Sequence, residues 1–149
     1  MKDGLILICE DSPNDVELTL EALSELRVGN TIEVARDGAE ALDYLYRRGA
    51  FEGRTSGNPV LVLLDLKMPR VDGLEVLRTI RSDPALKTVP VVVLTSSREE
   101  PDIARSYDLG VNAYVVKPVD SEQFTDAVRR LGLFWLIVNE PPPAAGRRG

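Results

Sequence analysis

Short apolar runs alternate along the chain with longer stretches in which apolar residues recur every three or four positions. The runs predict buried strands, and the stretches predict amphipathic helices. Ser12 and Asp37 are expected to cap the first two helices. The fourth helix is expected over residues 101–109, ended by Gly110. This alternation indicates an α/β fold, a doubly wound parallel sheet with helices on both faces. The five predicted strands cover residues 5–9, 31–35, 60–64, 91–94 and 113–116.

Polar side chains follow four of these strands: Glu10 and Asp11 the first, Asp65 the third, Thr95 the fourth and Lys117 the fifth. Because the carboxyl ends of parallel strands meet at one edge, these groups should share one shallow pocket. A single aspartate after a strand is usually a turn or capping residue, so the joint pattern carries the inference. Three carboxylates repel one another unless a hard cation such as Mg²⁺ is bound, and the lysine suits a phosphoryl group.

These motifs together resemble the receiver domains of bacterial two-component response regulators. The matching segments are LILICED, VLLDLKMPRVDG, VVVLTSS and AYVVKP, and the resemblance covers residues 4–132. Asp65 and Thr95 are 30 positions apart, and Thr95 and Lys117 are 22 apart, both typical of that family. The resemblance implies a flavodoxin-like (βα)5 receiver fold with strand order 2-1-3-4-5.

The resemblance also implies the chemistry of the site. Asp65 would accept a phosphoryl group from a sensor histidine kinase, or from a small donor such as acetyl phosphate. Mg²⁺ would be held by Glu10, Asp11, Asp65 and the backbone carbonyl of Lys67. The side chains of Lys67 and Ser97 would border the path of the hydrolytic water and set the phosphoryl lifetime. Such a protein is a phosphoacceptor in a phosphorelay, with its own Mg²⁺-dependent self-phosphorylation and autodephosphorylation.

Further residues take switch roles by the same resemblance. Thr95 and Lys117 would contact the phosphoryl oxygens, and Tyr114 would swing inward as Thr95 moves. The peptide bond between Lys117 and Pro118 is expected to be cis, a conformation that only proline makes accessible at low energy.

The chain departs from the usual family pattern at two places. A glycine-rich insertion at residues 47–58 is expected to lie on the surface, away from the site. The last helix continues into six apolar residues, 133–138. We therefore expect a receiver domain at 1–132 and an apolar extension with a proline-rich tail at 133–149, without an output domain. Both features resemble single-domain regulators that serve phytochrome-type light-sensing histidine kinases.

The extension 133–138 predicts an assembly. A helix of this segment would be apolar on every side, and one receiver core covers only one side. We expect a two-fold homodimer anchored by Phe134 and Trp135, although the segment could instead fold back on its own domain.

Composition removes several functions. The 149 residues contain no histidine, which excludes a Ser-His-Asp triad, a histidine-ligated zinc and a histidine general base. The formal net charge of −6 disfavours nucleic acid and anionic membranes as partners. Cys9, the single cysteine, lies in an apolar run and is expected to be buried and inert. No apolar stretch is long enough for a membrane span or a signal peptide, so we expect the protein in the cytoplasm.

Four other classes share parts of this pattern. A haloacid-dehalogenase-like phosphatase needs a second acid two residues after the nucleophile, where this chain has Lys67. A flavodoxin-like cofactor carrier needs a phosphate cradle after the first strand, where Glu10 and Asp11 would repel phosphate. A transcription factor needs a DNA-binding extension, and the tail is too short and apolar. A pseudo-receiver would have lost the aspartate, the hydroxyl or the lysine, and all three are present.

Overall fold

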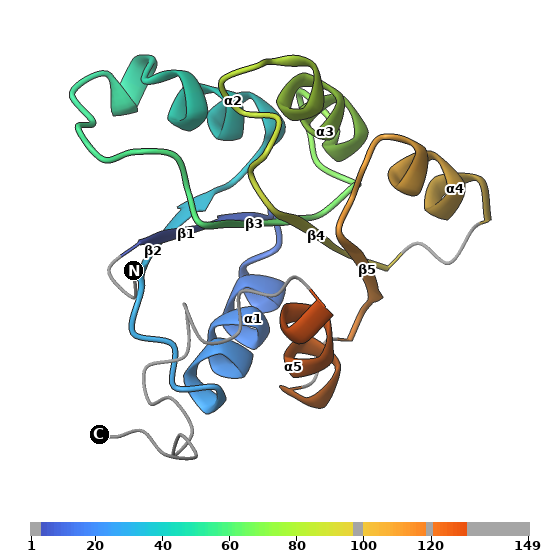
Figure 1. Ribbon diagram of the computed structural model, residues 1–149. Helices are drawn as coiled ribbons and strands as arrows, with labels where there is room; N and C mark the ends of the chain where they lie inside the picture. The colour runs from blue at the N-terminus through green and yellow to red at the C-terminus, as the bar shows by residue number, and fades with distance from the viewer. Residues whose placement is uncertain (1–3, 97–99, 119–120, 131–149) are drawn as a thin grey trace, which may run out of the picture.

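One parallel sheet lies between two layers of helices (Figure 1). The computed structural model describes residues 4–96, 100–118 and 121–130, and five strands of these residues form the sheet in the order β2-β1-β3-β4-β5. The predicted fold and strand order are confirmed. The third strand starts one residue later than predicted, and the fourth extends to Thr95. The strands are β1 (Leu5–Cys9), β2 (Thr31–Ala35), β3 (Leu61–Leu64), β4 (Val91–Thr95) and β5 (Ala113–Val116).

The helices connect successive strands and cover both faces of the sheet. Figure 1 shows α1 and α5 on one face and α2, α3 and α4 on the other. As predicted, Ser12 caps α1 and Asp37 caps α2, because their side chains accept hydrogen bonds from backbone N–H groups three residues on. The fourth helix begins and ends one residue earlier than predicted, and Gly110 follows it with φ +88°. The helices are α1 (Pro13–Glu25), α2 (Gly38–Tyr46), α3 (Gly73–Ser82), α4 (Glu100–Asp108) and α5 (Ser121–Arg130).

The core consists of two apolar layers, one on each face of the sheet. Every residue of β3 and β4 is buried, as expected for central strands covered on both sides. Alternate side chains of one strand enter opposite layers, so that Leu7 packs with the α2 and α3 side and Ile8 with the α1 and α5 side. Cys9 is buried as predicted, and this burial raises the pKa of its thiol above the usual range, which disfavours the reactive thiolate.

The insertion at residues 47–58 is held together by arginine. The guanidinium of Arg54 lies 4.1 Å from the ring centroid of Tyr44 and donates to the Tyr44 carbonyl at 3.0 Å. Phe51, in a short 3₁₀ turn (Gly49–Phe51), packs edge-to-face on the same ring. The insertion adjoins Leu5, the first residue of β1, and therefore lies away from the carboxyl ends of the strands.

Two sequence predictions fall on other parts of the chain. Ser97 and the dimer anchors Phe134 and Trp135 lie outside the described residues. Among the described helices, none combines the length and the apolar character that a bilayer crossing requires.

Candidate functional site

The sheet hydrogen bonds extend one residue past the strand ends and so place the polar residues at one edge. The backbone N–H of Asp65 donates to the carbonyl of Cys9 at 3.0 Å, and that of Lys117 donates to the carbonyl of Thr95 at 2.8 Å. The N–H of Glu10 donates to the last carbonyl of β2 at 2.9 Å. Residues that follow different strands are therefore fixed as neighbours.

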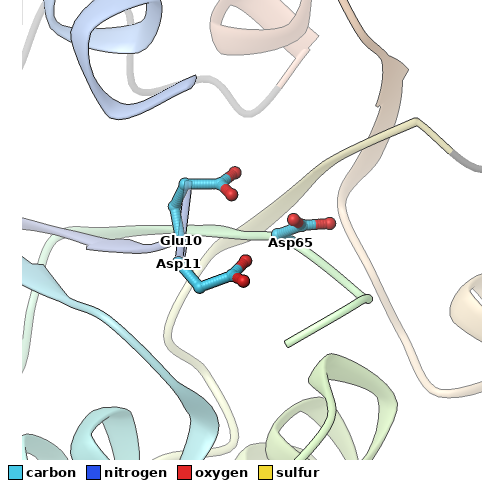
Figure 2. Close-up of side chains that lie close together, drawn as sticks. All are labelled: Glu10, Asp11 and Asp65. Carbon is cyan, nitrogen blue, oxygen red and sulfur yellow. The ribbon is translucent and has the colours of Figure 1, made fainter. Parts of the chain in front are cut away.

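Three carboxyl groups point into the same space at this edge (Figure 2). Each of Glu10, Asp11 and Asp65 offers one oxygen, and these oxygens lie within 4.8 Å of one another. Glu10 and Asp65 are buried and Asp11 is exposed. Hard oxygen donors at this spacing can hold one divalent cation, directly or through waters on the cation. The carboxylate group predicted from the sequence thus forms a candidate metal site.

Lys117 lies against this group of carboxylates. Its Nζ is 2.5 Å from Glu10 Oε1 and 3.2 Å from Asp65 Oδ2, and its side chain is only 11% exposed. It also donates to Asp15 Oδ2 at 2.8 Å. This contact of Asp15 with the site was not predicted from the sequence. The available signal was its place in the first turn after the strand that ends in Glu10 and Asp11.

The electrostatics of the site follow from burial and charge. Burial raises the pKa of Glu10 to about 7; the hydrogen bond from Lys117 opposes this rise, and the nearby Asp65 carboxylate adds to it. Burial lowers the pKa of Lys117, but hydrogen bonds to Asp15 and Glu10 outweigh it and hold that pKa above its ordinary value. The lysine is therefore a fixed positive charge, while the carboxylates repel one another without a metal.

The candidate switch residues lie on β4 and β5. Thr95 is fully buried at the end of β4. Tyr114, on β5, is half-buried and packs against the core on the α2 and α3 side. The Lys117–Pro118 peptide bond is cis, which confirms that prediction.

The side chain of Lys67 forms an ion pair with the first turn of α4. Its Nζ lies 3.6 Å from Asp102 Oδ2, and its side chain is 66% exposed. Its backbone N–H donates to Asp65 Oδ1 at 3.2 Å. The lysine side chain thus reaches α4 from the loop that follows Asp65.

Contacts with α3 and with the residue that caps α2 hold that loop, residues 65–72, in place. A Cβ on Gly73 would lie 2.2 Å from the backbone oxygen of Asp65, so α3 packs directly on the loop and only glycine fits. Arg70, at φ +69°, makes two hydrogen bonds of 3.0 Å to the carboxylate of Asp37, the cap of α2. The Arg70 guanidinium also holds the pKa of Asp37 below its usual range.

Comparison with known proteins agrees with this geometry. The family model described as the response regulator receiver domain matches residues 6–129. The chain belongs to this family. The response regulator Rcp1 from Synechocystis sp. is 40% identical over 140 residues, which cover 94% of this chain and 94% of Rcp1. A solved structure of its Mn²⁺-bound form has a TM-score of 0.75 at 37% identity, covering 95% of this chain and 99% of that chain.

Solved phytochrome-associated regulators are similar over nearly the whole chain. The bacteriophytochrome response regulator RtBRR is 56% identical with a TM-score of 0.85, covering 95% of this chain and 85% of that one. The phosphorylated cyanobacterial phytochrome response regulator RcpA is 41% identical with a TM-score of 0.76, covering 95% of this chain and 99% of that one. The predicted likeness to phytochrome regulators is thereby confirmed.

Proposed function

We propose that this response regulator accepts a phosphoryl group on Asp65 from a sensor histidine kinase. The observation that carries the proposal is the position of Asp65. Its carboxylate is buried, lies within the three-carboxylate group and is 3.2 Å from the ammonium of Lys117. A nucleophile that is already an anion needs no general base, which suits a chain without histidine.

The proposed transfer forms one bond and breaks one. A carboxylate oxygen of Asp65 attacks phosphorus, and the phosphorus–nitrogen bond of the donor phosphohistidine breaks, so that the imidazole keeps the bonding electron pair. With acetyl phosphate the phosphorus–oxygen bond breaks and acetate leaves. Lys117 and the hydroxyl of Thr95 contact the phosphoryl oxygens, and positioning with positive charge suffices for this reaction class. Water later attacks the phosphorus, which restores the carboxylate and releases phosphate.

The proposal includes a Mg²⁺ site formed by Glu10, Asp11, Asp65 and the backbone carbonyl of Lys67. Oxygen-only donors fit this cation, and the Mn²⁺-bound form of Rcp1 supports a divalent metal in a similar protein. When bound, the cation neutralises charge on the phosphoryl group. We expect Asp11→Asn to weaken Mg²⁺ binding most and Glu10→Gln to weaken it less, measured by calorimetric titration. Equal affinity in wild type and both variants would place the metal elsewhere.

The proposed donor is a phytochrome-type photoreceptor kinase in the cytoplasm. The support is the similarity to RtBRR and to RcpA, both described as phytochrome response regulators. Red-light-dependent transfer from such a kinase to this chain is the direct test. Transfer that ignores the light state of the kinase would contradict the link.

We also propose a homodimer, supported by the apolar segment 133–138. Sedimentation should show a dimer at tens of micromolar that Phe134→Ala/Trp135→Ala dissociates. The idea fails if the wild type is a monomer or if the double variant stays fully dimeric.

The phosphosite is tested by intact mass after incubation with acetyl phosphate and Mg²⁺. Wild type should gain one phosphoryl group, and Asp65→Asn should gain none. The matched control is Asp108→Asn, the same change at an exposed residue that ends α4; it should be labelled like wild type. Undiminished labelling of Asp65→Asn would remove Asp65 as the acceptor.

A further inference from the structure

Asp15 is a partner of Lys117 that stands outside the group of three carboxylates. An ammonium has three N–H donors, and the described residues offer Lys117 three carboxylates. Two of them, Glu10 and Asp65, belong to the candidate metal site. The third, Asp15 Oδ2, lies at 2.8 Å, nearer than Asp65 Oδ2 at 3.2 Å.

The first turn of α1 holds Asp15 in place. The backbone N–H of Asp15 is capped by the hydroxyl of Ser12 at 3.3 Å, and its carbonyl accepts from the buried hydroxyl of Thr19 at 2.9 Å. Its side chain is 30% exposed, so the contact with Lys117 is only partly screened by water. Asp15 therefore presents a fixed charge to the lysine from a helix rather than from a strand end.

A divalent cation at the site would neutralise the charges of Glu10 and Asp65, but not that of Asp15, which is not part of the group of three carboxylates. The ammonium of Lys117 must then divide its hydrogen bonds between Asp15 and the oxygens of a phosphoryl group on Asp65. We propose that Asp15 is a positioning residue that holds Lys117 in the unphosphorylated state and competes with the phosphoryl group for it. This inference rests on the proposed function of Asp65 as phosphoacceptor.

The first arm of the test needs neither metal nor phosphoryl group. Hydrogen exchange of the Lys117 ammonium is followed by NMR in metal-free protein, because a fixed ion pair slows this exchange. Asp15→Asn should speed the exchange roughly three- to tenfold, the effect of losing one charge-assisted hydrogen bond that is partly open to water. The matched control is Glu17→Gln, which removes the same charge from an exposed position of α1 and should leave exchange unchanged. Unchanged exchange in Asp15→Asn overturns the inference.

The second arm measures competition directly. Beryllofluoride mimics a phosphoryl group on a carboxylate, and its affinity is determined by calorimetry at saturating Mg²⁺. Asp15→Asn should bind it roughly three- to tenfold more tightly than wild type, and Glu17→Gln should bind like wild type. Unchanged or weaker binding by Asp15→Asn overturns the competition, as does an equal gain in both variants, which would indicate a general effect of charge.

The two arms separate the inference from the function on which it rests. If wild type binds no beryllofluoride and takes no phosphoryl group, the proposed function fails and the competition fails with it. The first arm still decides whether Asp15 holds Lys117. Unfolding midpoints of both variants close to that of wild type show that the fold is intact.

Discussion

Gly73 is the residue at which a single methyl group should disturb the site most directly. It is the first residue of α3, and a Cβ there would lie 2.2 Å from the backbone oxygen of Asp65 and 2.6 Å from Cα of Leu66. Both contacts are with backbone atoms, which cannot relieve the overlap by a change of rotamer as a flexible side chain would. Gly73→Ala must therefore push α3 away from the loop that carries Asp65.

The magnitude follows from two opposing effects. Overpacking a close-packed contact costs about 1–3 kcal/mol, and close backbone contacts place Gly73→Ala at the upper end. Replacing glycine by alanine also stabilises the folded state by up to about 1 kcal/mol, because it lowers the conformational entropy of the unfolded chain. The free energy of unfolding should therefore fall by about 2 kcal/mol. With a denaturant slope of about 2 kcal/mol per M, the urea midpoint should fall by about 1 M.

Urea unfolding of Gly73→Ala and of Gly53→Ala tests this reasoning. A Cβ on Gly53 would meet nothing within 4 Å, so that control should change stability by less than about 0.5 kcal/mol. Phosphorylation by acetyl phosphate should also slow in Gly73→Ala, because the clash is with the peptide group of Asp65 itself. Equal midpoints for the two variants would refute the close packing of α3 on this loop.

Three further predictions concern charged groups around the site. The folded-state pKa of Glu10, about 7, lies above the ordinary value of 4.5, so the folded metal-free protein holds more protons between these values. Its stability should fall as pH rises through this range, and urea unfolding in EDTA should show a flatter profile for Glu10→Gln; an unchanged profile would contradict the shift. Lys67→Asn should shorten the lifetime of the acyl phosphate, because the lysine side chain no longer borders the path of the hydrolytic water. Asp102→Asn should lengthen the lifetime, because it releases the Lys67 ammonium towards the phosphoryl group. A phosphate-release assay measures both lifetimes, and a longer lifetime in Lys67→Asn would reject the idea. Asp37→Ala should cost about 1 kcal/mol in the same unfolding assay, because it removes the side chain that caps α2. Asp37→Asn retains a capping group and should cost less; equal losses in the two variants would contradict the capping role.

The fold was predictable because each element carries its own signal. Continuous apolar runs such as the one in β3 indicate a doubly covered strand, and the caps Ser12 and Asp37 mark helix starts. The strand ends of a parallel sheet must meet at one edge, which brings Glu10, Asp65 and Lys117 together regardless of the loops between them. The boundary errors are of one residue, at strand and helix ends where local preference is weak.

The contacts that were not predicted join segments remote in sequence through side chains alone. Asp15 and Lys117 are 102 positions apart, and Arg70 and Asp37 are 33 apart. No periodicity or spacing rule connects such pairs, since each depends on the angle at which a helix meets the sheet. An acidic residue in the first turn of a helix also commonly stabilises the start of that helix. This role alone explains Asp15 in the sequence, so nothing there indicates its contact with the site.

The interactions around Asp65 differ in how readily a phosphoryl group can replace them. This difference decides which elements of the structure should respond to phosphorylation. The packing of Gly73 on the Asp65 peptide is a contact of backbone with backbone, and no ligand can substitute for it. The contacts of Lys117 with Asp15 and of Lys67 with Asp102 are ionic, and a phosphoryl group offers oxygens that compete for both ammonium groups. The pair of Lys67 with Asp102 is largely open to water on the lysine side, and exposed pairs contribute about 1 kcal/mol or less, so a new doubly charged partner readily shifts that balance. The pair of Lys117 with Asp15 is less screened, and there the phosphoryl group competes for the hydrogen bonds of the ammonium. The loop after β3 should therefore hold its position when Asp65 is phosphorylated, while the ionic contacts of the site with the first turn of α1 and with the N-terminal turn of α4 weaken.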